Sequence, residues 1–251
     1  MILLFSTREL TIATFLLPLV LFIGYLIQYF VSVVVTKFFF MHIDKRHPVV
    51  AGAVERDFEE NIKFIQYHNW KNFMYRIIKF KITHSPFPYL VNWSWNFLGL
   101  ATIEKNSVLE DIYHPHELTL IEEGAYVGPA SKIISQTVEG AVGRIVFKDI
   151  KISRRACLCT NFISGPGNEF GEYLIALPNS AVPKNNKMRG FRIYQGAPPY
   201  RLTEGRAKRI FFPTEEMAEE VLPDLRKLKK EKKARLKREK EEKARKKRKK
   251  T

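Results

Sequence analysis

Cysteine, charge and histidine are each missing from long stretches of this 251-residue chain. Its two cysteines, Cys157 and Cys159, are too few for a disulfide framework, and they cannot form a four-cysteine zinc site. No charged residue occurs from Leu10 to Thr36, and no histidine follows His116. An uncharged apolar stretch of this length excludes an ordinary soluble monomer.

Positive charge is abundant but unevenly placed. The chain has 42 Lys and Arg against 26 Asp and Glu, a formal net charge of +16. Residues Arg226 to Lys250 alone contain 17 Lys or Arg against four Glu. The basic character therefore describes a C-terminal tail, and it does not predict a nucleic-acid-binding body.

The stretch from Leu10 to Thr36 is about 27 residues long, or roughly 40 Å as a helix, against a hydrocarbon core of about 30 Å. It can cross a membrane once with tilt, helped by a bend at Pro18 or Gly24. It is too long for the core of a signal peptide, and Arg8 followed by Glu9 makes a poor basic leader. A buried core helix is the alternative.

Cations flank this stretch asymmetrically. Arg8 stands almost alone before it, whereas four cations follow it: Lys37, Lys45, Arg46 and Arg56. The positive-inside rule therefore predicts a single-pass protein of the cell membrane with the bulk of the chain in the cytoplasm. Farther along, Trp70 to Phe80 mixes aromatic residues with cations, which fits either an interfacial amphipathic helix or a helix packed on the body.

Aliphatic residues recur every six positions in the middle of the chain. One ladder contains Ile103, Leu109, Ile121, Val127 and Ile133, and a second, shifted by one residue, contains Val146, Ile152, Leu158, Phe170, Ala176 and Val182. Small or hydroxyl residues follow four places after many ladder positions, among them Ser107, Thr119, Ala125, Ser131 and Thr137. The slip between the two ladders predicts a projecting loop at TVEGAVGR.

A six-residue period is typical of a chain wound into a triangular prism. Each aliphatic residue points toward the axis, and each small residue fits the corner where the chain turns. The sequence thus predicts a mainly β protein with a parallel β-helix. We expect an anchor over residues 1–41, a juxtamembrane linker over 42–98, the β-helix over 99–202 and a charged tail over 203–251.

These features resemble the hexapeptide-repeat acyltransferases, whose fold is a left-handed parallel β-helix. The similarity extends over about Phe73 to Leu202, and it is closest to membrane-attached acyltransferase-like domains of proteins related to peptide synthetases. In that group an arginine- and aromatic-rich segment leads to a proline-rich link, and a Leu-Gly-x-x-Ile pattern opens the prism. A corner loop interrupts the prism, and a glycine- and proline-containing motif closes it. The corresponding segments here are Tyr75 to Pro88, LGLATIEKNSVLED, SQTVEG (Ser135 to Gly140) and GAPPYR (Gly196 to Arg201).

The resemblance implies transfer of an acetyl or other acyl group from coenzyme A to a hydroxyl or amine, with histidine as general base. The family's corner-loop histidine is replaced here by Gln136, which can orient a substrate but cannot accept a proton. Glu139 matches the loop acid of the family. Because positions about eighteen residues apart stack on successive coils, His116 could lie beside Gln136 and, with His114, supply the missing base. Two surface histidines beside Pro115 are the alternative.

Four arginines, Arg154, Arg155, Arg189 and Arg192, are candidates to hold the diphosphate of acetyl or acyl coenzyme A, although they could equally be solvated surface cations. No metal site is expected, because a carbonic-anhydrase-like centre needs three histidines. We expect Cys157 and Cys159 to point to the same side of a strand. Buried structural thiols are the favoured interpretation, and a covalent acyl carrier is the alternative.

The tail from Pro223 predicts a highly charged helix or a disordered arm. Beneath a membrane it would be attracted to anionic lipid, whereas nucleic acid is a less favoured partner and simple solvation is the third alternative. Two functions therefore remain: a membrane-anchored acyltransferase-like enzyme, or a degenerate β-helix scaffold that binds lipid or a partner through its tail. Family members are trimers with sites between prisms, so a homotrimer is expected, and a monomer is the alternative.

Overall fold

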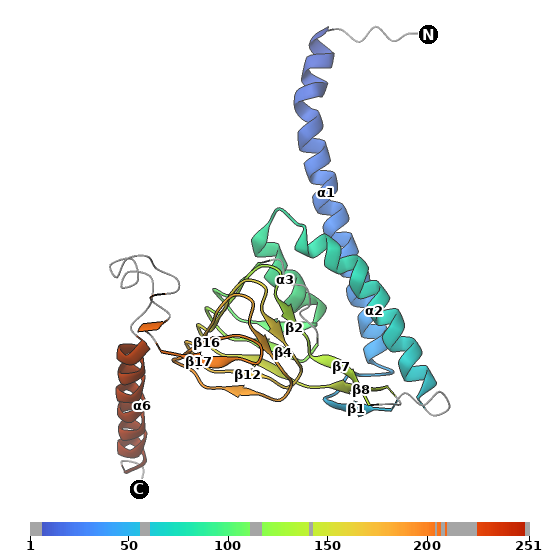
Figure 1. Ribbon diagram of the computed structural model, residues 1–251. Helices are drawn as coiled ribbons and strands as arrows, with labels where there is room; N and C mark the ends of the chain where they lie inside the picture. The colour runs from blue at the N-terminus through green and yellow to red at the C-terminus, as the bar shows by residue number, and fades with distance from the viewer. Residues whose placement is uncertain are drawn as a thin grey trace. The chain divides into compact units, whose positions relative to one another are not determined.

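The computed structural model describes residues 7–55, 61–110, 117–140, 143–203 and 225–248, together with residues 205, 206 and 209. The chain divides into two compact units. One comprises Met1–Val49 and Asp57–Leu98, and it is helical (Figure 1). The other comprises Val50–Arg56 and Gly99–Thr251, and it is mainly β.

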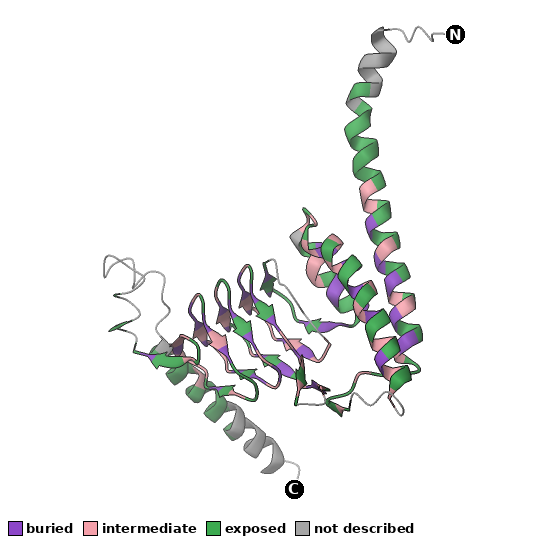
Figure 2. Ribbon diagram, turned by 45° about the vertical axis from the view of Figure 1, so that its right-hand side comes forward, coloured by how far each residue is buried: buried purple, intermediate pink, exposed green. Residues whose placement is uncertain are grey.

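The helical unit contains α1 (Thr7–Asp44), α2 (Ile62–Thr83) and α3 (Pro88–Leu98). Within the described residues, the segment Leu16–Asp44 of α1 is long and apolar enough to cross a membrane. Among its described side chains the first buried one is Tyr29, and the buried residues form a helical stripe made of Tyr29, Val33, Thr36, Phe40 and Ile43. The more N-terminal described side chains of α1 are largely exposed (Figure 2).

Helix α2 has two different faces. Tyr75, Ile78 and Ile82 are buried, whereas Trp70 and Phe80 are exposed. The buried face packs within the helical unit, where the Lys71 ammonium of α2 forms an ion pair with Asp44 of α1. The sequence left open whether this segment is an interfacial amphipathic helix or a helix packed on the body; one face packs against other helices, and the aromatic side chains Trp70 and Phe80 of the other are exposed.

The β unit is a three-sided prism of short parallel strands, and we name its faces in chain order. Face 1 contains β2 (Ala101–Ile103), β4 (Thr119–Ile121), β9 (Ile150–Ile152), β12 (Glu169–Phe170) and β15 (Lys187–Met188). Face 2 contains β3 (Val108–Leu109), β5 (Tyr126–Val127), β10 (Cys157–Leu158), β13 (Ile175–Ala176) and β16 (Ile193–Gln195). Face 3 contains β6 (Lys132–Ile133), β11 (Ile163–Ser164) and β14 (Ala181–Val182). Edges are named by the faces that they join.

The six-residue ladder lines the axis of this prism. Ile121, Val127 and Ile133 of one coil are at most 1% exposed, and Ile152 and Leu158 of the next are fully buried. Each strand pairs in register with the strand eighteen residues later where no insertion intervenes, as Cys157 pairs with Ile175. The prediction of a parallel β-helix is therefore confirmed by burial and by strand pairing.

The corners explain how the chain turns every six residues. Residues with positive φ recur at this spacing: Arg155, Asn161, Gly167, Tyr173, Asn179, Asn185 and Phe191. This left-handed conformation is open to glycine and tolerated by asparagine. The residues that follow the first five of these corners are buried: Ala156, Phe162, Asn168, Leu174 and Ser180. A sharp turn followed by an inward side chain is thus the repeating unit.

Ser164 interrupts the apolar ladder with a side-chain hydroxyl that is fully hydrogen-bonded. The Ser164 hydroxyl donates to the Gly165 carbonyl and accepts from the Asn168 amide nitrogen, with separations of 3.0 and 3.1 Å. The Asn168 side-chain oxygen in turn accepts from the Asn186 backbone N–H at 2.8 Å. Because every one of these groups has a partner, the buried serine and asparagine are accommodated without an orphaned polar atom.

The loop predicted at TVEGAVGR is a β-hairpin. Strands β7 (Gln136–Glu139) and β8 (Arg144–Phe147) pair antiparallel, and β1 (Gly52–Val54) joins the other side of β8. The assignments of Val146 and Thr137 to the prism were wrong, because both residues lie in this hairpin. Val146 is buried nonetheless, opposite Ala53 of β1.

The coil ends where β17 (Tyr200–Leu202) turns back and pairs antiparallel with β16. This is the place of the predicted closing motif. The described part of the tail forms α6 (Leu225–Arg248), which is the helical alternative of the two considered for it. Lys232 of α6 forms an ion pair with Glu172 of the β-helix.

Candidate functional site

The four candidate arginines share one edge of the prism. Arg154 and Arg155 lie between β9 and β10, and Arg189 and Arg192 lie between β15 and β16. Both connections join face 1 to face 2, so all four residues lie at edge 1–2, in the first and third of three successive coils. The spacing of the sequence alone did not establish this common position.

A column of stacked side chains runs along the same edge. The Arg155 guanidinium lies 5.7 Å from the centre of the Tyr173 ring and donates to the Tyr173 hydroxyl at 3.1 Å. The Tyr173 ring stacks on Phe191 at 5.1 Å, and the Lys232 ammonium of α6 lies 5.8 Å from the Phe191 centroid. Three consecutive corner positions thus form a cation–aromatic stack.

A groove of about 640 Å³ lies between this edge and α6. The β-helix contributes Arg154, Glu172 and Tyr173 to it. The lining residues of α6 combine cations with apolar side chains and one carboxylate: Leu228, Glu231, Lys232, Ala234, Arg235, Leu236 and Arg238. The groove therefore offers net positive charge beside an aromatic ring.

A smaller cavity of about 170 Å³ at the same end of the coil is more strongly cationic. It is lined by Phe191, Arg192, Ile193, Arg201, Leu202, Thr203, Arg226 and Lys229. These described lining residues include four cations and no carboxylate. Sequence reasoning had singled out only Arg192 among them. Arg201 lies in the closing motif, where its charge was the one available signal.

Edge 3–1 holds the other set of candidates. Glu139 ends β7, and its carboxylate forms an ion pair with the Lys184 ammonium at 2.9 Å. Lys184, with Lys148 and Arg144 nearby, holds the pKa of Glu139 below its usual range. Glu139 is therefore an ionised carboxylate at neutral pH and a weak base.

Gln136 begins β7, and it lies opposite Phe147. Because side chains alternate along a strand, Gln136 and Glu139 project from opposite faces of the hairpin. The structure therefore does not bring these two candidates together. His114 and His116, the candidate bases, lie outside the described residues.

Cys157 and Cys159 do share one side of face 2, as expected. Their sulfur atoms are 3.8 Å apart, and both residues are partly buried. The hydrogen bond to Cys159 and burial raise the pKa of the Cys157 thiol. A protonated thiol is a poor nucleophile, so this geometry favours the structural interpretation of Cys157. Within the described part of the chain, no cluster of three His, Cys, Asp or Glu could hold a metal ion.

The chain matches no protein-family model and no curated protein. Its structure is similar to that of a hexapeptide-repeat-containing acetyltransferase from Vibrio cholerae O1 biovar eltor, complexed with acetyl coenzyme A. That pair has a TM-score of 0.43 at 14% identity, over 59% of this chain and 91% of the other. A maltose O-acetyltransferase from Clostridium difficile 630 gives 0.39 at 10% identity, over 51% and 82%. A galactoside acetyltransferase in complex with coenzyme A gives 0.33 at 12% identity, over 59% and 84%.

Proposed function

We propose that this chain is a membrane-anchored acyltransferase of the hexapeptide-repeat type, with left-handed winding of its β-helix. It would take an acetyl or other acyl group from coenzyme A and transfer it to a hydroxyl or amine of a membrane-associated acceptor. We assign the anchor to α1, and the excess of cations after it supports a cytoplasmic position of the β-helix.

The cationic cavity at edge 1–2 is the observation that carries this proposal. Arg192 and Arg201 from the last coil meet Arg226 and Lys229 from α6 around a volume of about 170 Å³. Guanidinium groups bind phosphate oxygens through charge-assisted hydrogen bonds, so the residues present fit the phosphates of coenzyme A. The adjoining groove offers Tyr173 and Leu228 as apolar wall for the less polar part of such a ligand.

The reaction needs a bound acyl donor and a base that activates the acceptor. Acyl coenzyme A, when bound, supplies the acyl group as a thioester. We assign to His116, or to the neighbouring His114, removal of the proton from the acceptor hydroxyl or amine as that group attacks the thioester carbonyl carbon. The carbon–sulfur bond breaks, and the imidazolium returns the proton to the sulfur of the released coenzyme A. The Gln136 amide can hydrogen-bond the acceptor and orient it. Glu139 is a poorer candidate for the base, because its ion pair with Lys184 stabilises the charged carboxylate.

A non-catalytic scaffold is the second candidate. Gln136 in place of a histidine favours it, as does the engagement of Glu139 in an ion pair. Such a protein would use the coil for assembly and the basic tail for anionic lipid. Coenzyme A binding separates the candidates, because a scaffold has no need to retain it.

Charge removal at the cavity should weaken coenzyme A binding. A hydrogen bond to a charged group contributes about 1.5 kcal/mol, or roughly tenfold in Kd. We therefore expect Arg192→Gln with Arg201→Gln to raise the Kd about a hundredfold. Isothermal titration of coenzyme A into the detergent-solubilised full chain measures this change.

The matched control is Lys132→Gln with Lys63→Gln. It removes the same charge from face 3 and from α2, and it should leave the Kd unchanged. Equal weakening by both double variants would mean that binding depends only on net charge. No saturable binding to the unmodified chain would favour the scaffold.

The separation of the two candidate sets supports a trimer. Glu139 and Lys184 lie at edge 3–1, whereas the arginines lie at edge 1–2, and face 1 stands between these edges. A second copy placed edge to edge could bring the Gln136–Glu139 strand of one chain to the cavity of the next. Sedimentation equilibrium in density-matched detergent should give three chains per particle, and a single chain would contradict this arrangement.

A further inference from the structure

Part of α1 is covered by the other two helices, and part is not. From Leu10 to Phe30 the chain carries no charge, and these residues would measure about 30 Å as a helix, equal to the hydrocarbon core of a bilayer. The stripe of buried residues begins at Tyr29 and continues away from this segment to Ile43. If α1 spans a membrane, the water boundary on the side of α2 therefore lies near Phe30.

The positions of charged side chains in α2 and α1 are consistent with a water boundary near Phe30. The Lys81 ammonium of α2 donates to the Ser32 hydroxyl of α1 at 2.7 Å. Lys37 of α1 donates to the Leu98 carbonyl at 3.3 Å. No Asp, Glu, Lys or Arg follows Lys81 until Glu104. The helical hairpin is thus uncharged from the end of α2 through all of α3.

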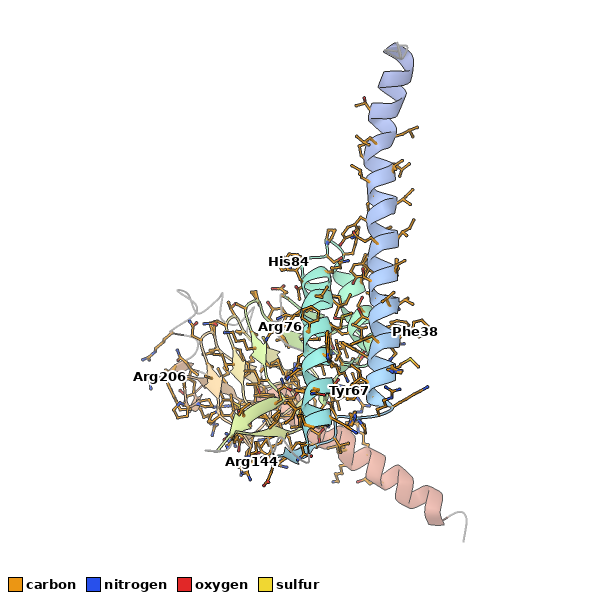
Figure 3. All side chains as sticks on the ribbon, turned by 90° about the vertical axis from the view of Figure 1, so that its right-hand side faces the viewer. Phe38, Tyr67, Arg76, His84, Arg144 and Arg206 are labelled. Atoms are coloured by element: carbon orange, nitrogen blue, oxygen red, sulfur yellow. The ribbon has the colours of Figure 1, made fainter. Side chains whose placement is uncertain are left out.

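The turn between α2 and α3 reaches farther toward the N-terminus of α1 than Lys81 does. The Phe87 ring lies 5.8 Å from the Phe22 ring and 6.4 Å from the Tyr25 ring. Phe22 precedes Ser32 by about 15 Å of helix, on the hydrocarbon side of the boundary. His84, which follows α2, lies level with the middle of α1 in the view of Figure 3.

Every residue of the turn at 84–88 is either a proline or has a hydrogen-bonded backbone N–H, as an apolar solvent requires. A peptide N–H without a partner is costly in hydrocarbon. Pro86 and Pro88 have no N–H to satisfy. The N–H groups of His84 and Ser85 donate to the Phe80 and Ile82 carbonyls, both at 3.2 Å, and the Phe87 N–H donates to the Ser85 hydroxyl at 3.4 Å.

Exposed aromatic residues surround this turn. Tyr89 is 69% exposed, and Phe80, which lies between Lys79 and Lys81, is 65% exposed. Trp93 and Phe97 of α3 stack on each other and are also exposed. Trp and Tyr rings are enriched where protein meets the lipid headgroups.

We infer that the turn at residues 84–88, with the start of α3, dips into the bilayer beside α1 as a re-entrant helical hairpin. The inference rests on the proposed membrane anchor, and its occupant is the lipid of the leaflet on the side of α2. The hairpin would fix the depth of the chain at the bilayer more firmly than one tilting helix could.

Tryptophan fluorescence in vesicles tests this inference. The background chain carries Trp70→Phe and Trp93→Phe, and it keeps Trp95, which is buried at 1% exposure. Tyr89→Trp reports on the turn, Leu21→Trp reports on α1, and the chain that keeps Trp70 reports on the part of α2 beside Asp44. The quencher is phosphatidylcholine brominated near the middle or near the headgroup end of its acyl chains.

Bromolipid should remove about half or more of the fluorescence added by Tyr89→Trp, as for Leu21→Trp, and little of that of Trp70. Native Trp93, kept in a Trp70→Phe chain, should respond most to bromine near the headgroup. This second reporter needs no change in the hairpin. Iodide in the water should quench Trp70 and spare Tyr89→Trp.

The outcomes separate the hairpin from the anchor. Quenching of Leu21→Trp by bromolipid without quenching of Tyr89→Trp or Trp93 overturns the inference and leaves the anchor standing. Tyr89→Trp that responds neither to bromolipid nor to iodide also overturns it, because a second chain then covers the turn. If Leu21→Trp is not quenched either, the anchor fails and the hairpin inference fails with it.

Discussion

Replacing Gly171 by alanine is expected to lower the free energy of unfolding of the β-helix by about 3 kcal/mol. Gly171 follows the buried Phe170, where two successive coils approach each other closely. A Cβ atom at this position would lie 2.3 Å from the Gly190 backbone nitrogen and 2.7 Å from its Cα. Because both obstacles are backbone, no side-chain rotation relieves the clash, and the coils must separate.

Thermal unfolding followed by circular dichroism measures the effect on the full chain. In a protein of this size the expected loss corresponds to a fall in Tm of about 10 °C. Gly205→Ala is the matched control, since a Cβ there meets nothing within 4 Å. An unchanged Tm for Gly171→Ala would mean that the coils stand farther apart than the structure places them.

The second large effect is expected at the candidate base. His116→Ala should lower the turnover of acetyl coenzyme A by 10²–10⁴-fold, the usual contribution of a general base. Glu139→Gln should have a much smaller effect, because Lys184 already holds that carboxylate in its charged form. Chromatography of released coenzyme A, with a panel of hydroxyl and amine acceptors, gives the rates.

His42→Ala serves as the control for loss of an exposed histidine, because His42 lies near the end of α1 in the helical unit. His114→Ala distinguishes the two neighbouring imidazoles. Turnover that survives both His114→Ala and His116→Ala would remove the histidines from the mechanism and return Glu139 as the candidate.

The sequence predicted the β-helix because each coil repeats a local rule. In one coil Ile121, Val127 and Ile133 each point toward the axis, and the residues between them form the corners where the chain turns. Val146 satisfied the same spacing by coincidence. Its partner Ala53 lies about 90 residues earlier, and no local pattern indicates a pairing across that separation.

Less of the candidate site than of the fold could be predicted from the sequence. Arg154 and Arg192 were identified as candidate phosphate ligands, whereas three other cations of the cavity, Arg201, Arg226 and Lys229, were not. Arg226 and Lys229 are two cations in a tail rich in them, so nothing in the sequence marks them as cavity residues. Their role depends on where α6 contacts the coil.

The structure of the full chain saturated with coenzyme A tests the central claim most directly. We predict that the ligand lies along edge 1–2, with its phosphates in the cavity formed by Arg192, Arg201, Arg226 and Lys229. Tyr173 and the α6 side of the groove should contact the remainder of the molecule. Coenzyme A bound at another face, or absent at saturating concentration, would contradict the account.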